Sequence, residues 1–313
     1  AKPSEPAPTP EPSPIPATAT FTVIPTETET PLPTATATPA FSIFGTWEPD
    51  RATTTVLVKQ PPPGQYCDPN SGMWITPIIT LLTFLFAFLH TGQNLGWKRA
   101  ILFLTTVFVV SVSFESIGVA TGVIYGPYHY TAEMLGPKIF GLVPLLIPVA
   151  WFMMTYASFV LAVMIVPTRL IPKGLGWLGV AALSGVMMTS WDLAMDPLMV
   201  AGGHWVWHIE GAYFGVPLQN YWGWWLTTFT GVWIYQFIAD KFPAGSDRGR
   251  SNIPLVWVVT AYALMGASSV GMEFIFGMDG PALVGIFAML PWVLTGYLAV
   301  QRHFMRDGDA SSI

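Results

Sequence analysis

The chain has 313 residues, of which 52% are hydrophobic and only 10% are charged, whereas ordinary globular domains carry about 25% charged residues. This deficit of charge indicates a membrane protein. The formal net charge of -5 and the lack of a basic cluster argue against a nucleic-acid partner. A single cysteine, Cys67, excludes an internal disulfide framework and a zinc site built from cysteines.

Residues 1–46 are dominated by proline, threonine, alanine and glutamate, as in the stretch PTETETPLPTATATPA. This composition is too poor in apolar residues to form a core, and it predicts an extended arm with polyproline II character. Residues 47–73 add a few aromatic residues and a proline-rich turn before the membrane domain. The arm is either docked on a partner or a flexible stalk, and the sequence leaves both open.

Seven long apolar runs follow, each close to the roughly 20 residues that a helix needs to cross a bilayer. The expected spans are 74–91, 100–122, 140–166, 175–196, 222–240, 253–273 and 282–301. We therefore expect an all-α, polytopic membrane bundle of about seven transmembrane helices over residues 74–306, followed by a short cytoplasmic tail at 307–313.

Basic residues predict the orientation of this bundle. Nine lysines and arginines follow the odd-numbered spans, and only Lys138 lies in the opposite connections. Positive residues favour the cytoplasmic side of a membrane. The sequence thus predicts a cytoplasmic C-terminus and a periplasmic or extracytoplasmic N-terminal arm.

The same topology brings acids from separate segments to a similar depth near the outer surface. These acids are Glu115 in the second span, Asp192 and Asp196 in the fourth, Glu210 in the connection after it and Glu273 in the sixth. Ionisable residues at membrane depth are costly and usually face the interior of a bundle, so they are functional candidates.

Asp192 and Asp196 stand out because residues four apart on a helix are neighbours. In a low-dielectric site, one carboxyl is expected to keep its proton while the other ionises. Such a pair could protonate a substrate. The alternative is that Asp192 bonds within the bundle while Asp196, just before Pro197, ends the helix near the headgroups.

The outer connection after the fourth span is unusually aromatic. Six of the fourteen tryptophans lie between Trp191 and Trp225, and the glycines there favour a segment that folds back over the bundle. An aromatic belt would explain part of this enrichment, but an aromatic cavity also suits a long conjugated ligand and can stabilise a carbocation. His204 and His208 are a weak metal signal, and interfacial histidines are the better interpretation.

Three stretches resemble a known family. Residues 114–130, FESIGVATGVIYGPYHY, residues 141–151, GLVPLLIPVAW, and residues 191–225, WDLAMDPLMVAGGHWVWHIEGAYFGVPLQNYWGWW, are similar to membrane carotenoid hydratases of the bisanhydrobacterioruberin hydratase and γ-carotene 1',2'-hydratase type. The shared pattern is an acid before G-x-x-x-G, a D-x-x-x-D-P pair, W-x-W and G-V-P-x-x-N. The resemblance covers roughly residues 74–306.

The resemblance implies a membrane protein that binds a linear or monocyclic C40 carotenoid and adds water across its terminal double bond without a cofactor. The positions that match the family pattern are Glu115, Asp192, Asp196, Trp205, Trp207, Tyr213 and Asn220. The residue pattern adds Glu210 as a fourth catalytic candidate and Trp191, Tyr125 and Tyr128 as carotenoid-binding candidates. Which acid donates the proton stays open.

We expect carotenoid and membrane lipid as partners, no metal, and a location in a bacterial cytoplasmic membrane. The alternative is a non-catalytic carotenoid-binding subunit of a photosynthetic reaction centre and its light-harvesting antenna. The long arm departs from the family pattern, and it would suit docking on neighbouring proteins in such an assembly.

Overall fold

A computed structural model describes residues 75–131, 137–242 and 254–310. The arm expected at residues 1–46 and the pre-membrane segment expected at 47–73 lie outside these residues. The seven expected membrane spans lie within them except for residues 74 and 253, and residues 311–313 of the expected tail lie outside.

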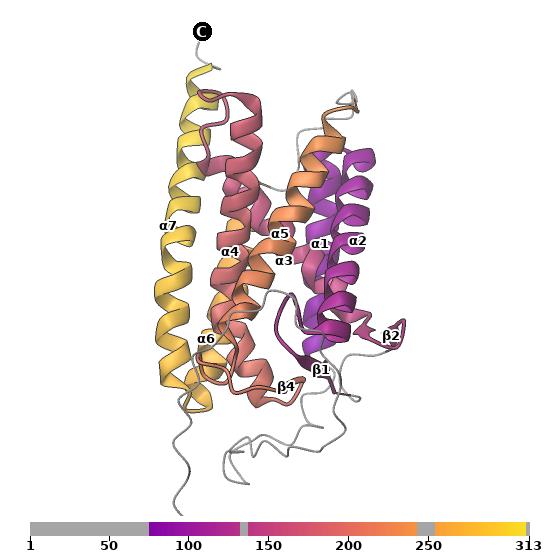
Figure 1. The fold of residues 1–313 in the computed structure, drawn as a ribbon. Helices are drawn as coiled ribbons and strands as arrows, with labels where there is room; N and C mark the ends of the chain where they lie inside the picture. Colours follow the sequence, from indigo (N-terminus) through magenta and orange to yellow (C-terminus); the bar gives the residue numbers. More distant parts are fainter. Residues whose placement is uncertain (1–74, 132–136, 243–253, 311–313) are drawn as a thin grey trace, which may run out of the picture. The chain divides into compact units, whose positions relative to one another are not determined.

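Seven helices make up most of the described chain, in the order that the apolar runs predict (Figure 1). They are α1 (Ile75–Leu95), α2 (Trp97–Thr121), α3 (Leu146–Ile165), α4 (Lys173–Ala201), α5 (Leu218–Ala239), α6 (Val256–Ile275) and α7 (Asp279–Ala310). The prediction of an all-α membrane bundle is confirmed.

Six of the seven helices are long and apolar enough to cross a bilayer. The other is α5, whose mean hydropathy is lowered by Gln219, Asn220 and a run of tryptophan and tyrosine. Large apolar side chains cover the outside of the bundle, where Leu82, Leu264 and Phe287 are 62%, 63% and 74% exposed. Such a surface suits contact with lipid and would be unfavourable in water.

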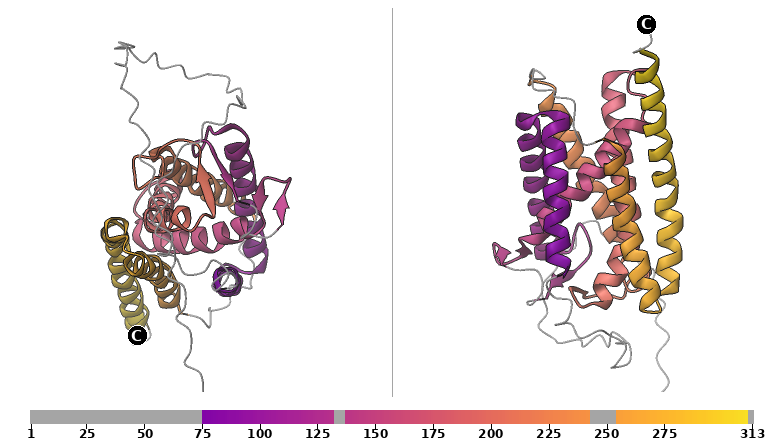
Figure 2. Two further views of the ribbon diagram at one scale, coloured as in Figure 1. Left: turned by 90° about the horizontal axis from the view of Figure 1, so that it is seen from below. Right: turned by 180° about the vertical axis from the view of Figure 1, so that it is seen from behind.

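The helix α3 lies at the centre of the bundle. All residues from Trp151 to Ala162 are buried, on every face of the helix, as expected for a helix that is hydrophobic all round. It contacts α1, α2, α4, α6 and α7. Figure 2 shows α6 and α7 side by side at one edge of the bundle, where both contact α4.

The third helix begins later than the apolar run suggests. Two short paired strands, β2 (Lys138–Ile139) and β3 (Val143–Pro144), precede α3. The turn between them requires positive φ at Phe140 and Gly141, with values of 51° and 71°. A helix cannot pass through this conformation, so α3 starts only at Leu146.

A second pair of strands covers the end of the bundle where the acids lie. The strands β1 (Tyr128–Tyr130) and β4 (Trp205–Trp207) are antiparallel, with Tyr128 opposite Trp207 and Tyr130 opposite Trp205. Side chains alternate between the two faces of a strand, and these four aromatic residues are the buried ones. The turns expected here thus contain a small two-stranded sheet with an aromatic inner face.

Basic residues gather at the other end of the bundle. Lys173 at the start of α4 forms an ion pair with Asp240 at the end of α5. Arg99 at the start of α2 donates to the carbonyl oxygen of Phe242, at 3.1 Å. In contrast, Lys138 lies at the acidic end, where its Nζ donates to the carbonyl oxygen of Tyr130. Arg99 and Lys173 thus lie at the end of the bundle opposite the buried acids.

We expect Gly223→Ala to destabilise the acidic end of the bundle. A Cβ at Gly223 would lie 2.4 Å from the Tyr125 ring and 2.8 Å from the carbonyl oxygen of Ile124. Overpacking of this kind lowers the free energy of unfolding by about 1–3 kcal/mol. Thermal unfolding in detergent, followed by circular dichroism, measures the effect.

Gly271→Ala is the matched control for Gly223→Ala, because nothing lies within 4 Å of a Cβ added there. This variant should unfold at or slightly above the temperature of the native chain, since alanine favours the helix. Equal melting temperatures for the two variants would contradict the close packing at Gly223.

Candidate functional site

Four acids are buried at the end of the bundle covered by β1 and β4. Glu115 on α2, Asp192 and Asp196 on α4, and Glu273 on α6 are between 0% and 3% exposed. The charges of Glu115 and Asp196 act on Asp192, which places three of the carboxyls near one another. Glu210, expected beside them, is exposed after β4 and makes no side-chain hydrogen bond to another described residue.

Glu115 is held by three donors from two separate elements. The hydroxyls of Tyr128 and Tyr130 on β1 donate to Oε2, the second at 2.8 Å. The indole Nε1 of Trp151 on α3 donates to Oε1 at 2.8 Å. The carboxylate accepts in all three bonds, and such charge-assisted bonds can hold an anion at membrane depth.

Asp192 and Asp196 share one partner but differ in their other contacts. The amide Nδ2 of Asn220 on α5 donates to Oδ2 of both, at 3.1 Å and 2.5 Å. Oδ1 of Asp196 also accepts from Nε1 of Trp205, at 2.8 Å. Oδ1 of Asp192 is buried and has no partner among the described residues. The two neighbouring carboxyls are therefore not equivalent.

The helix α4 does not end at Asp196. It continues through Pro197 to Ala201, so the alternative in which Asp196 ends the helix is wrong, and Asp196 is buried within the bundle. A proline within a helix leaves the carbonyl four residues earlier without its usual donor, and here that carbonyl belongs to Leu193. It accepts the hydroxyl of Tyr213, at 2.9 Å. This bond attaches the loop after β4 to α4, beside Asp192.

The small sheet joins the two acidic groups. Tyr128 and Tyr130 on β1 hold Glu115, while Trp205 on β4 holds Asp196. The ring of Tyr128 packs on that of Trp207, with centroids 4.9 Å apart. Each strand is hydrogen-bonded to a different carboxyl. The pairing of the strands therefore links the position of Glu115 to that of Asp196.

Tryptophans from three helices pack beneath the sheet. The indole of Trp224 on α5 stacks on Trp151, with centroids 4.3 Å apart, and meets the edge of Trp191 at 6.1 Å. Tyr125 packs edge-on against Tyr128 at 6.1 Å and bonds the hydroxyl of Thr227. Trp191 and Tyr125 therefore lie in the aromatic wall of the site, and Tyr125 makes no hydrogen bond to an acid.

The site residues predicted from the sequence do not include Trp151, Trp224, Tyr130 or Glu273. Trp151 lies in an apolar run with no signal that its indole meets an acid. The signal for Tyr130 was available, because YHY and WVW alternate large aromatic and smaller or polar residues with the period of a strand.

His204 and His208, the weak metal signal of the sequence, make contacts with different partners. His208 shares a hydrogen bond of 2.7 Å with His129 on the exposed face of the sheet. The backbone of His204 bonds the carbonyl of Met199. Among the described residues, no three histidine, cysteine, aspartate or glutamate side chains are grouped to hold a metal.

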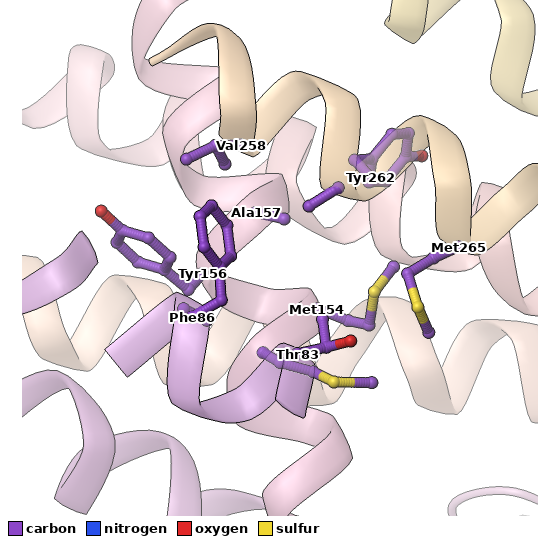
Figure 3. Close-up of a pocket in the computed structure, with 11 residues that line it drawn as sticks. Thr83, Phe86, Met154, Tyr156, Ala157, Val258, Tyr262 and Met265 are labelled. Carbon is purple, nitrogen blue, oxygen red and sulfur yellow. The ribbon is translucent and has the colours of Figure 1, made fainter. Parts of the chain in front are cut away.

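An apolar pocket lies elsewhere, between α1, α3 and α6. Phe86, Met154 and Met265 are among the residues that line it (Figure 3). A second pocket at the basic end is lined by Arg99, Trp177 and others. None of the four buried acids lines either pocket.

The fold and site define a polytopic helical membrane protein with a group of carboxyls buried among aromatic rings. Residues 75–291 match the family described as carotenoid biosynthesis protein. The chain belongs to this carotenoid biosynthesis family, as the resemblance in its sequence predicts.

One curated relative is bisanhydrobacterioruberin hydratase of Haloarcula japonica. It is 33% identical over 159 residues, which are 51% of this chain and 52% of that protein. The aligned region therefore spans about half the length of the relative. No solved structure matches the chain.

We expect the covering sheet to lose stability in acid. Burial, with His208 and Lys138 nearby, lowers the pKa of His129 below its ordinary value of 6.5, and burial lowers the pKa of His204. The unfolded chain then binds protons more tightly than the folded chain. The stabilisation is complete above about pH 6.5 and is lost as the pH falls below it.

The melting temperature of the native chain should therefore fall relative to that of His129→Gln between pH 7.5 and pH 5, because the variant lacks the contribution of His129. A pH dependence identical to that of the native chain would show that His129 does not contribute.

Proposed function

We propose that this chain is a carotenoid hydratase, which adds water across the terminal double bond of a linear or monocyclic C40 carotenoid. Membership of a carotenoid biosynthesis family supports the substrate class, and the similarity to a bisanhydrobacterioruberin hydratase supports the reaction. The observation that carries the proposal is the unequal bonding of Asp192 and Asp196 in a buried, aromatic site.

This inequality supports Asp192 as the proton donor. Both oxygens of Asp196 accept hydrogen bonds from neutral N–H donors, which favours its ionised form. Two ionised carboxyls one helical turn apart, away from water, would repel each other strongly. Asp192 is thus the member that keeps its proton, and its unpaired Oδ1 can present that proton to a substrate.

The reaction needs only acid and base groups. The Asp192 proton adds to the less substituted carbon of the terminal alkene and leaves a tertiary cation on its neighbour. The carboxylates of Glu115 and Asp196 stabilise this positive charge electrostatically, and aromatic ring faces near the cation add to that effect. Water then bonds to the cation and loses one proton, so the sum is addition of one water without an oxidant, metal or cofactor.

The orientation in the membrane is part of this proposal. Basic residues at the end opposite the acids favour a cytoplasmic position for that end. The acids then lie beneath the outer surface of the cytoplasmic membrane, and the C-terminus is cytoplasmic. The carotenoid chain extends from the acids toward the hydrocarbon of the bilayer.

The alternative of a pigment-binding subunit in a photosynthetic assembly rests on the N-terminal arm, outside the described residues. Neither the carotenoid biosynthesis family nor the hydratase relative points to photosynthesis or light harvesting. Hydration is therefore the function that the described site supports best.

Asp192→Asn should abolish most hydration in cells that make lycopene or γ-carotene. A positioned general acid contributes about 10²–10⁴-fold to a rate, and asparagine keeps the shape without the acidic proton. Chromatography and mass analysis of the extracted carotenoids measure the hydroxylated product. Asp196→Asn should lose less, because it removes only the supporting charge.

Asp279→Asn serves as the control, because Asp279 is an exposed acid in the first turn of α7. This variant should form product at the rate of the native chain. Normal hydration by Asp192→Asn, or a larger loss in Asp196→Asn, would overturn the assignment of the donor.

A further inference from the structure

Several buried polar atoms near Asp192 have no protein partner. Both carboxyl oxygens of Glu273 are buried and unpaired among the described residues, and so is the hydroxyl of Tyr221. Glu273 is 0% exposed and Tyr221 is 8% exposed. Buried polar groups in proteins almost always have a hydrogen-bond partner, so this group of atoms is built to bind something polar.

Glu273 lies on α6 and Tyr221 on α5, and both helices pack near the acidic end of α4. The rings of Tyr213 and Tyr221 meet edge to face, with centroids 5.3 Å apart. Burial, followed by the nearby carboxyls of Glu273 and Asp192, raises the pKa of the Tyr213 hydroxyl. The charges of Asp192 and Glu273 also act on Tyr221. The tyrosine pair is attached to α4 beside Asp192, because the Tyr213 hydroxyl donates to the carbonyl oxygen of Leu193 and Asn220, next to Tyr221, donates to Asp192.

The other acids are not free to act on water. All three donors around Glu115 are directed at its carboxylate, and both oxygens of Asp196 are engaged. Glu210 is exposed. Glu273 alone among the described acids combines full burial with two unpaired oxygens.

We propose that Glu273 and Tyr221 bind the water molecule that is added to the carotenoid, and that Glu273 takes its proton. This inference rests on the proposed hydration. A buried water makes about three hydrogen bonds to otherwise unsatisfied polar groups. The Glu273 carboxylate and the Tyr221 hydroxyl supply two of these bonds and leave the oxygen able to reach the cation.

The protons balance over one cycle. Asp192 gives its proton to the alkene carbon and becomes a carboxylate. The water oxygen bonds to the cationic carbon, and one of its protons passes to Glu273. That proton then returns from Glu273 to Asp192 through the Tyr221 hydroxyl, which accepts one proton as it releases another. Both carboxyls end in their starting states.

Glu273→Gln separates the capture of water from the protonation of the alkene. Membranes containing the full chain and lycopene are incubated in D₂O, so that Asp192 carries deuterium. In the native chain, each product molecule gains one carbon-bound deuterium beside the new hydroxyl. In Glu273→Gln the cation still forms but returns to alkene by losing a proton from the adjacent carbon.

We therefore expect Glu273→Gln to form product about 100-fold more slowly, while deuterium accumulates in the recovered lycopene. Glu273→Asp should recover part of the hydration, because it restores a carboxylate. Tyr221→Phe keeps the ring packing and should hydrate about 10-fold more slowly with the same deuterium exchange. Mass spectrometry of product and recovered lycopene measures both quantities.

Two results would overturn this inference while leaving the proposed hydration intact. One is hydration at the native rate in Glu273→Gln or Tyr221→Phe. The other is loss of both hydration and exchange in Glu273→Gln that still retains lycopene, which would place Glu273 in the protonation step. If the native chain itself neither hydrates lycopene nor incorporates deuterium, the proposed function fails and this inference fails with it.

Discussion

The arrangement of this site depends on the need to satisfy carboxylates buried at the end of a membrane bundle. Glu115 and Asp196 are out of reach of bulk water, and each is held by N–H or O–H donors of aromatic or amide side chains. No lysine or arginine is hydrogen-bonded to them within the described residues. Neutral donors leave the negative charge uncompensated and therefore available to stabilise a positive charge that develops nearby.

The donors come from a covering sheet whose position is fixed by the same bonds. Each strand contributes large aromatic residues to the inner face, and those residues reach the acids. Pro197 adds a further attachment, because the carbonyl that it leaves free in α4 accepts the hydroxyl of Tyr213. A break in the helical bonding pattern thus holds the aromatic loop beside Asp192.

The buried acids differ in their hydrogen bonding. Fully bonded carboxyls supply a fixed field, whereas Asp192 and Glu273 keep oxygens that no described residue satisfies. One of these acids lies on α4 and the other on α6. A site that gives a proton to one carbon and takes a proton from water needs two such groups, held apart.

The sequence by itself determined the helices and the acids. Hydrophobic length is a local property, so each apolar run predicts its own span, and charge at membrane depth marks Glu115, Asp192 and Asp196 without knowledge of their neighbours. The sequence could not establish where α3 starts, because that start depends on two residues with positive φ. It also could not establish that Glu210 is exposed.

Only the tertiary structure decided which buried carboxyl oxygens have a hydrogen-bond partner and which have none among the described residues. The bonds from Trp151 to Glu115 and from Asn220 to Asp192 join residues 36 and 28 positions apart. Such pairs form only when helix packing brings particular faces together, and no periodicity within a single segment reports that packing.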